Sequence, residues 1–315
     1  MKQIIKKLKQ AKNIAVVAHI SPDPDCMSSM TALCYILNQF GKQTKMFVDA
    51  DKTRDFIEFY NTDTRQLSKD LNPEEFDLIV TVDVPSIRQL GKYGKIILSF
   101  KNSLSIDHHL SRDLPIECKY VDANKSSCSE IIFELAKQMK AEITPRLASL
   151  IFAGIVGDTN CFENDNINED TFKTAAECIK YGADKNRIVY LFKKHQSRAE
   201  FELKKLGYQN MVIKDRIGYI IFTSKMFKET GATDYPYFVT ELLNLEDNVF
   251  AFAIKQKEKN TYTVSIRCKE GYNAARVANI FGGGGHIQAA GFAFTGAPVK
   301  HAKLICEECL KQIKD

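Results

Sequence analysis

Residues 14–30 read Ile-Ala-Val-Val-Ala-His-Ile-Ser-Pro-Asp-Pro-Asp-Cys-Met-Ser-Ser-Met, and this stretch decides the fold. Its first five residues form a β-branched, apolar run that is typical of a buried strand. His19 ends the run, and Asp23 and Asp25 flank Pro24 in the turn that follows. Open α/β sheets bind ligands at the carboxyl ends of their strands, so the stretch predicts an α/β fold with a site at this edge. The alternative is a simple Pro-Asp turn in which Asp25 caps a helix.

The bulk composition bounds the class of protein. The chain has 315 residues, which suits two domains, and a mild net charge of +5. That charge fits nucleotides or short phosphodiesters better than long duplex DNA, which usually needs a concentrated basic face. The nine cysteines are scattered and no secretory signal precedes them, so we expect reduced thiols and a cytoplasmic location. No apolar run reaches the length of a membrane span, so we expect no membrane partner.

Three later apolar runs also end in acidic or imidazole side chains. Residues 76–83 end in Asp83, the run at 104–106 leads into Asp107-His108-His109, and the run at 147–156 is closed by Asp158. We interpret all three as strands that end in ligand groups. The expected helices lie at residues 1–12, 28–40, 56–60, from the serine cluster at 126–129 to about 139, at 171–181, and at 186–210.

The second half of the chain has a different pattern. Short strands are expected at 217–222, 250–254, 262–267 and 292–294, with a helix at about 274–281. The sequence therefore predicts a parallel-sheet, Rossmann-like α/β domain over residues 1–185 and a smaller α+β domain over 211–315. The charged segment 186–210 would be a helical linker between them.

The strand-end groups predict a metal centre. If the strands share one parallel sheet, their end groups converge on one crevice. Five carboxylates packed together repel one another unless cations neutralise them. Mixed carboxylate and imidazole ligands suit Mn²⁺, with Mg²⁺ or Co²⁺ as substitutes. Two such ions can polarise a phosphoryl group and activate a water, which points to phosphoester hydrolysis. The converging groups are His19, Asp23, Asp25, Asp83, Asp107, His108, His109 and Asp158.

A run of four glycines suggests a second site. Gly282 to Gly285 precede His286, and glycines let an anion approach the backbone N–H groups closely. His286 and Arg267 would add charged donors for phosphate. A flexible linker is the alternative interpretation, but a helix precedes the run and a strand follows it.

Taken together, the motifs resemble those of the DHH phosphoesterases, of the standalone type with a DHH-associated C-terminal domain. Within that family the chain is similar to the NrnA-like nanoRNase (oligoribonuclease) and pAp phosphatase type. The motifs occur in family order and span nearly the whole chain. They are His19-Ile-Ser-Pro-Asp23-Pro-Asp25, Asp83 with Arg88-Gln-Leu-Gly91, Asp107-His108-His109, Gly157-Asp158-Thr159, and Gly282–His286 with Ala289-Ala-Gly291.

The resemblance implies a role for each motif residue. His19, Asp23 and Asp83 would hold one metal ion, and Asp25, Asp83, His108 and Asp158 would hold the other, with Asp83 as the bridge. Asp107 would orient a ligand, and His109 would face the scissile phosphate. Arg88, Arg267, Gly283, Gly284, Gly285 and His286 would bind the substrate, which would lie between the two domains.

The implied activity is Mn²⁺-dependent hydrolysis of short single-stranded RNA or DNA oligonucleotides to mononucleotides, together with removal of the 3′-phosphate of pAp. Hydrolysis of linear or cyclic dinucleotides, such as pApA and cyclic di-AMP, is the alternative. Asn160 and Cys268 replace the Gly and Ser common in the family and leave substrate preference open. A nucleic-acid-binding module without catalysis is the alternative from another class, and the intact Asp and His residues argue against it. A homodimer is compatible with the sequence, which does not define the oligomeric state.

Overall fold

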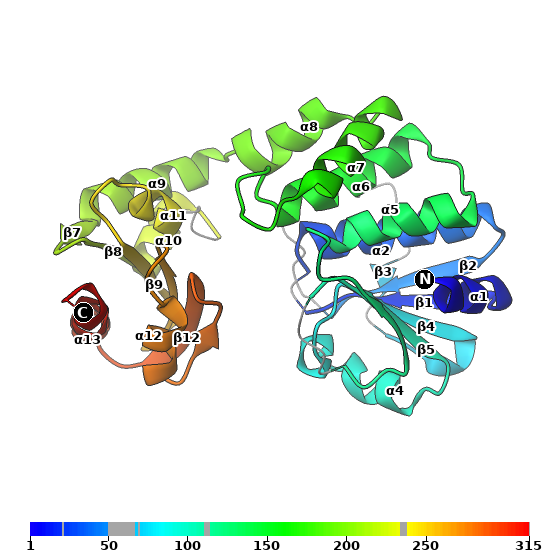
Figure 1. The fold of residues 1–315 in the computed structure, drawn as a ribbon. Helices are drawn as coiled ribbons and strands as arrows, with labels where there is room; N and C mark the ends of the chain where they lie inside the picture. Colours follow the sequence, from blue (N-terminus) through cyan, green and yellow to red (C-terminus); the bar gives the residue numbers. More distant parts are fainter. Residues whose placement is uncertain (21, 50–66, 69, 110–113, 234–237, 315) are drawn as a thin grey trace. The chain divides into compact units, whose positions relative to one another are not determined.

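The computed structural model describes residues 1–20, 22–49, 67–68, 70–109, 114–233 and 238–314. The chain divides into two compact units, Met1–His195 and Gln196–Asp315, and each is considered by itself (Figure 1). The helix predicted at residues 56–60 lies outside the described residues.

The first unit is built on a parallel sheet. Its six strands lie in the order β3-β2-β1-β4-β5-β6, and every neighbouring pair is parallel. This arrangement confirms the predicted α/β class. The strands are β1 (Asn13–Val17), β2 (Gln43–Phe47), β3 (Leu67–Ser68), β4 (Leu78–Val82), β5 (Ser103–Asp107) and β6 (Cys118–Val121).

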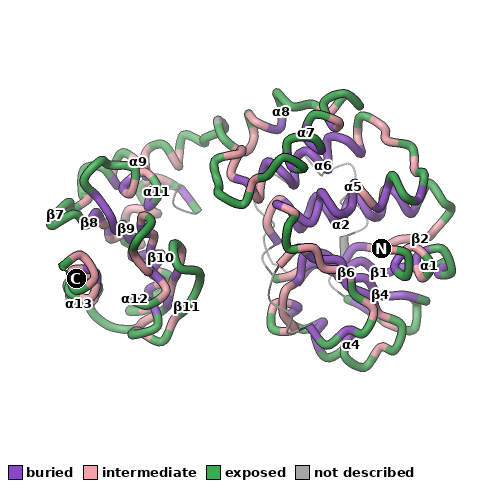
Figure 2. Tube along the Cα trace, viewed as in Figure 1, coloured by how far each residue is buried: buried purple, intermediate pink, exposed green. Residues whose placement is uncertain are grey.

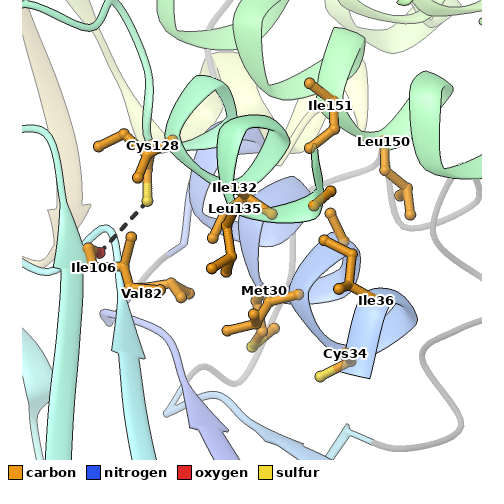
Figure 3. Packing of buried hydrophobic residues seen from close by; sticks show 14 of the residues in the cluster. Met30, Cys34, Ile36, Val82, Ile106, Cys128, Ile132, Leu135, Leu150 and Ile151 are labelled. Atoms are coloured by element: carbon orange, nitrogen blue, oxygen red, sulfur yellow. Dashed lines mark hydrogen bonds between the residues drawn. The ribbon is translucent and has the colours of Figure 1, made fainter. Parts of the chain in front are cut away.

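Helices cover both faces of this sheet. On one face α2, α5 and α6 pack together, and Figure 3 shows Met30, Ile132 and Ile151 from these helices in the same apolar cluster as Val82 and Ile106 of the strands. On the other face the 3-10 helix η3 and α4 enclose a smaller core. In Figure 2 buried residues follow α2, α5 and the central strands β1 and β4. The helical segments are α1 (Lys2–Gln10), α2 (Pro24–Gln39), η2 (Pro73–Glu75), η3 (Ile87–Leu90), α4 (Tyr93–Ser99), α5 (Cys128–Met139), α6 (Pro145–Asp158) and α7 (Glu169–Lys180).

Helix α2 begins four residues before the predicted start at Ser28. The carboxylate of Asp23 accepts a hydrogen bond from the Cys26 N–H at 2.9 Å, and Pro24 occupies the first helical position. An Asp N-cap followed by Pro is a strong start signal, because both satisfy or remove N–H groups that the helix leaves unpaired. The acidic turn is therefore part of the helix start, which places Asp25 within the first turn.

The prediction that Asp158 ends a strand is wrong. Residues 145–158 form helix α6, which starts at Pro145 with Thr144 as its cap and ends at Asp158. The helix is buried from Leu147 to Val156 between its neighbours, so its sequence is apolar on every side and shows no helical period. Periodicity cannot separate such a helix from a buried strand.

The single linker helix predicted at 186–210 is also wrong. Helix α8 (Lys185–Val189) continues as a π-helical turn, η4 (Tyr190–Lys194), and α9 (Arg198–Asn210) begins after a break. Ser197 caps α9, because its hydroxyl accepts from the Glu200 N–H at 3.1 Å while Glu200 accepts from the Ser197 N–H at 2.8 Å. A capping box needs extended backbone at the cap, so it interrupts the helix there.

The second unit contains a mixed sheet in the order β11-β12-β10-β9-β8-β7, antiparallel except for the β8–β9 pair. The four predicted strands and the hairpin between β9 and β10 are confirmed, and β7 is an edge strand that the sequence analysis missed. Two cores lie on the sheet, one under α12 and α13 and one under α9 and α11. The elements are β7 (Val212–Lys214), β8 (Ile217–Phe222), α10 (Ser224–Thr230), α11 (Phe238–Leu243), β9 (Phe250–Glu258), β10 (Thr261–Cys268), α12 (Ala274–Ile280), β11 (Gly284–Gly285), β12 (Ala289–Thr295) and α13 (Pro298–Lys314).

Over the described residues of both units, no helix is both long enough and apolar enough to cross a membrane.

Candidate metal centre

Acidic and imidazole side chains gather at the carboxyl edge of the parallel sheet in the first unit. His19 follows β1, Asp83 follows β4, and His108 and His109 follow β5. Parallel strands end at the same edge, which explains why residues far apart in sequence meet here. Helix α2 adds the two aspartates of its first turn, and α6 adds Asp158 at its end.

Three overlapping groups of these side chains could each hold a cation. They are His19 with Cys26 and Asp83; Asp83 with His108 and His109; and Asp25 with His108 and Asp158. Within each group the ligand atoms lie within 4.8 Å of one another. Asp83 and His108 each belong to two groups, so the three groups form one continuous cluster of side chains. Asp23 joins the cluster through its Oδ2 atom, 4.0 Å from His19 Nε2.

The geometry of His108 shows that the donor set fits a cation. Its Nδ1 lies 3.2 Å from the Lys125 carbonyl oxygen, which can only accept, so Nδ1 carries the proton. The lone pair of Nε2 therefore points 3.5 Å from Asp83 Oδ1 and 3.5 Å from Asp158 Oδ2. Within the described part of the chain, buried Nε2 and Asp83 Oδ1 have no hydrogen-bond partner. His108 Nε2 and the two carboxylate oxygens thus face one another without a hydrogen bond between them, and this set of donor atoms suits a divalent cation.

The carboxyl groups of the cluster resist ionisation without a cation. Burial raises the pKa of Asp83 well above its usual value, and the charges of Asp25 and Asp23 raise it further. Burial, followed by the same two charges, raises the pKa of Asp158 to about 8. Burial likewise raises the pKa of Asp25. A bound cation would favour the ionised forms.

Asp83 is held in an unusual backbone conformation. Its φ is +57°, in the left-handed region, and its N–H donates to the Ile106 carbonyl at 2.9 Å. A non-glycine residue in this region costs about 1–3 kcal/mol, and such strain clusters at functional sites. The conformation places the carboxylate, whose side chain is 2% exposed, between two of the three groups.

Asp107 orients both histidines that follow it. Its Oδ1 accepts from the backbone N–H of His108 at 2.8 Å and of His109 at 3.2 Å, and from His109 Nδ1 at 2.8 Å. Burial lowers the pKa of His109, but the hydrogen bond and charge of Asp107 outweigh it, so the pKa is raised. The His109 side chain remains 38% exposed and offers its ring to a ligand.

The first turn of helix α5 holds Asp25. The N–H groups of Cys128 and Ser129 donate to the two carboxylate oxygens at 2.6 and 3.0 Å, and the Ser29 hydroxyl adds a bond of 3.3 Å. The positive end of a helix dipole favours a carboxylate at this position. Asp25 is thus oriented by an element that starts more than 100 residues later in the chain.

The segment that carries Arg88 braces the turn after β1. The Gln89 carbonyl accepts from the Ile20 N–H at 2.7 Å, next to His19. Gly91 has φ +53°, and a Cβ there would lie 2.5 Å from Asp49 Oδ2 and 2.7 Å from the Ile20 side chain. A larger residue at 91 would therefore push the turn aside. Arg88 itself is exposed in η3.

In the second unit the glycine run is not an open loop for anions. The N–H of Gly283 donates to the Ala278 carbonyl at 2.9 Å and that of His286 to the Ala289 carbonyl at 2.8 Å. Gly284 and Gly285 pair with β12 as strand β11. The Gly283 N–H is therefore already bonded within the domain, and the run allows close backbone packing: a Cβ on Gly283 would lie 2.2 Å from the Gly291 oxygen. The phosphate contact of these glycines stays a prediction.

Two family matches agree with these two units. Residues 13–155 match the DHH family, N-terminal domain, and residues 221–314 match the DHHA1 domain. A bifunctional oligoribonuclease and PAP phosphatase NrnA from Mycoplasma genitalium is 30% identical to the chain over 316 residues, covering 99% of the chain and 97% of that relative. The chain belongs to the DHH family.

Solved structures show the same fold for this DHH chain. An exopolyphosphatase-related protein from Bacteroides fragilis is 22% identical and superposes with a TM-score of 0.89 over 99% of the chain and 96% of its own. RecJ from Thermus thermophilus, solved with Mn²⁺, is 15% identical with a TM-score of 0.56 over 97% of the chain and 53% of its own. Membership of the DHH phosphoesterases makes the chain a hydrolase acting on phosphoester bonds.

The DHH domain brings together all eight Asp and His residues that the sequence analysis singled out in it. Arg267 and His286 belong to the DHHA1 domain, which is described by itself. The sequence analysis missed Cys26, whose thiol lies in a group with His19 and Asp83. Burial raises the pKa of Cys26 well above its usual value, which favours the protonated thiol in the absence of a cation. No local signal marks it, because a cysteine in the first turn of a buried helix has the pattern of a core residue.

Proposed function

We propose that this DHH-family hydrolase uses two divalent cations to hydrolyse short single-stranded RNA or DNA oligonucleotides to mononucleotides, and that it also removes the 3′-phosphate of pAp. The observation that carries the proposal is a pair of buried atoms, Asp83 Oδ1 and His108 Nε2, which lie 3.5 Å apart in an acidic cluster and have no hydrogen-bond partner among the residues that the structure describes. The substrate class is supported by the relative from Mycoplasma genitalium, which is named as an oligoribonuclease and PAP phosphatase.

The proposed ligand sets use Asp and His members of the overlapping groups and add Asp23. His19, Asp23 and Asp83 would hold one ion, and Asp25, Asp83, His108 and Asp158 would hold the other. Mn²⁺ suits this mixture of imidazole and carboxylate donors, with Mg²⁺ or Co²⁺ as substitutes. When bound, the two ions would polarise the scissile phosphoryl group and lower the pKa of the attacking water.

The other residues act on the substrate and on the ligands. Asp107 fixes the ring of His109 through Nδ1, so the exposed edge of that ring can contact the scissile phosphate or the leaving oxygen. Exposed Arg88 would bind a substrate phosphate. Arg267 and His286 would bind a terminal phosphate through their side chains. We assign this activity to the cytoplasm.

The test is a product-resolved digestion with graded substrates. Chelator-treated protein with Mn²⁺ restored is incubated with end-labelled oligonucleotides of increasing length, pAp, pApA and cyclic di-AMP in parallel. We expect mononucleotide release that is fastest on the shortest oligonucleotides and requires the cation. Faster turnover of pApA or cyclic di-AMP would instead support the dinucleotide alternative. Tight nucleic-acid binding without any product would support a binding module.

A further inference from the structure

Glu130 is a buried carboxylate that belongs to none of the candidate cation groups. It lies in the first turn of α5 and is 0% exposed. One oxygen, Oε1, accepts from the Ser126 N–H at 3.0 Å, the Ser126 hydroxyl at 2.5 Å and the Thr171 hydroxyl at 3.1 Å. The other, Oε2, has no partner among the described residues. Burying a carboxylate is costly, so this placement calls for a role.

A single peptide unit links Glu130 to His108. The N–H of Ser126 and the carbonyl of Lys125 belong to the same planar unit and point to opposite sides. Glu130 binds the N–H side, and the Lys125 carbonyl accepts from His108 Nδ1 at 3.2 Å on the other side. A chain of hydrogen bonds therefore connects the Glu130 carboxylate, through one rigid peptide unit, to the His108 ring, whose Nε2 faces Asp83 and Asp158.

Hydrogen bonds from several side chains hold the segment 124–126, which contains this peptide unit. The side chain of Asn166 donates to the Ser126 carbonyl at 3.0 Å, and that of Asn168 donates to the Asn124 carbonyl at 2.6 Å. Thr171, at the start of α7, completes the network through Glu130. The peptide plane has little freedom to rotate, so the direction of its carbonyl is well defined.

We propose that Glu130 is a positioning residue that sets the orientation and basicity of His108 toward the cation. Hydrogen bonds in a chain polarise one another, so the charge on Glu130 makes the Lys125 carbonyl a stronger acceptor for the His108 Nδ1–H. A stronger acceptor at Nδ1 makes Nε2 a better ligand, as the outer partners of metal-bound histidines do. The inference rests on the proposed function in one respect, that His108 binds the cation.

Three variants separate this role from a purely structural one. Glu130→Met removes the acceptor. Glu130→Gln keeps an oxygen that can take all three bonds at the Oε1 position, but removes the charge. Glu134→Gln is the matched control, because Glu134 lies one turn later on α5 and contacts the Lys125 side chain, at 2.6 Å from Nζ, rather than the peptide.

The readout is the dissociation constant for Mn²⁺, measured by calorimetry on chelator-treated protein, with melting of the metal-free form recorded for each variant. We expect affinity to fall about 10–100-fold in Glu130→Met, the range seen for outer partners of metal-bound histidines. Glu130→Gln should lose several-fold, and Glu134→Gln should bind as the wild type does.

Each outcome bears on a distinct claim. If Glu130→Met melts lower but binds Mn²⁺ as tightly as the wild type, Glu130 is only structural and the inference is overturned. If Glu134→Gln loses as much affinity for Mn²⁺ as Glu130→Gln, the inference is overturned too, because the loss of any nearby negative charge would then explain the effect. If Glu130→Met does not fold, the comparison of the two glutamine variants decides in the same way. If the wild type does not bind Mn²⁺, the proposed function itself fails.

Discussion

At the scale of single residues, Asp83 combines a left-handed backbone, near-complete burial and membership of two cation groups. Asn tolerates the left-handed region and has the same shape, so Asp83→Asn removes the charge without disturbing the backbone. We expect turnover to fall by more than about 100-fold on every substrate, because a shared ligand matters more than an outer partner. The measurement is kcat/KM with saturating Mn²⁺.

The control for this variant is Asp122→Asn. Asp122 follows β6 at the same edge of the sheet, but it bonds the Asn124 N–H at 3.1 Å and belongs to no cation group of the described residues. Its variant should keep wild-type turnover. Metal-free Asp83→Asn should melt no lower than the metal-free wild type, because burial raises the pKa of Asp83 and so lowers stability at neutral pH, a cost that the neutral amide does not carry. Near-normal turnover of Asp83→Asn would contradict the shared-ligand assignment.

The sequence predicts which residues gather in the cluster better than it predicts the contacts that hold their side chains in place. His19, Asp83 and His108 each follow a strand, so the parallel-sheet rule is enough to bring them together. The backbone partners of Asp25 come from α5, and no local pattern links a turn at residue 25 to N–H groups at 128 and 129. Contacts of that kind depend on how helices pack on the sheet.

At the scale of elements, Asp158 lies in the cluster where the sequence placed it, although its element was predicted as a strand and is a helix. The residue ends α6, at the negative end of the helix dipole, where a carboxylate is unfavourable without a cation. Capping signals would have helped: Thr144-Pro145 starts α6, and Ser197 with Glu200 starts α9. Apolar content alone does not distinguish a helix enclosed by other helices from a strand.

The glycine run gives an element-scale prediction with a matched pair. A Cβ on Gly283 would lie 2.2 Å from the Gly291 oxygen, whereas one on Gly284 would meet its nearest neighbour, Asn279 Oδ1, at 3.7 Å. Gly283→Ala should therefore separate β11 from β12 and lower the free energy of unfolding by about 1–3 kcal/mol, the usual cost of overpacking. Gly284→Ala should stay close to the wild type in chemical denaturation.

The KM for pAp tests the same two variants, Gly283→Ala and Gly284→Ala, for the alternative role in anion binding. An anion-binding role of the backbone predicts that both variants raise KM for pAp while unfolding is unchanged. If the glycines serve strand packing, Gly283→Ala alone should lose stability, and Gly284→Ala should keep both the stability and the KM of the wild type. The second pattern is the one we expect, since the Gly283 N–H already donates to Ala278.

At the scale of the whole molecule, the cation cluster should couple metal binding to stability. Without a cation, the buried Asp83 and Asp158 carboxyl groups have raised pKa values, first because they are buried and second because other carboxylates are close. Each ion present at 100 times its dissociation constant adds about 2.7 kcal/mol if the unfolded chain does not bind it. The melting midpoint should therefore drop on chelation and return with Mn²⁺, and an unchanged midpoint would mean that the cluster holds no cation.

The last prediction concerns substrate length. Under the proposed function the cations would contact only the scissile phosphate, which every phosphodiester offers, so we expect a preference for short substrates to come from other residues. Arg267 and His286 of the DHHA1 domain are the proposed source, because a terminal phosphate carries more charge than an internal one and attracts cationic donors more strongly. Arg267 lies on β10, where its Nη1 donates to the Ile266 carbonyl at 3.0 Å, and this fixes the guanidinium against the strand.

Arg267→Ala should weaken binding of pAp and short 5′-phosphorylated substrates by roughly 1.5–3 kcal/mol, the scale of a hydrogen bond to a charged group. It should barely change hydrolysis of a small activated phosphodiester that reaches only the metal centre. The informative quantity is the ratio of the two losses in kcat/KM, with Arg276→Ala, on the exposed side of α12, as the control. Equal losses on both substrates would show that Arg267 supports the fold or the centre, because a residue that measures the end of a substrate cannot affect one that lacks it.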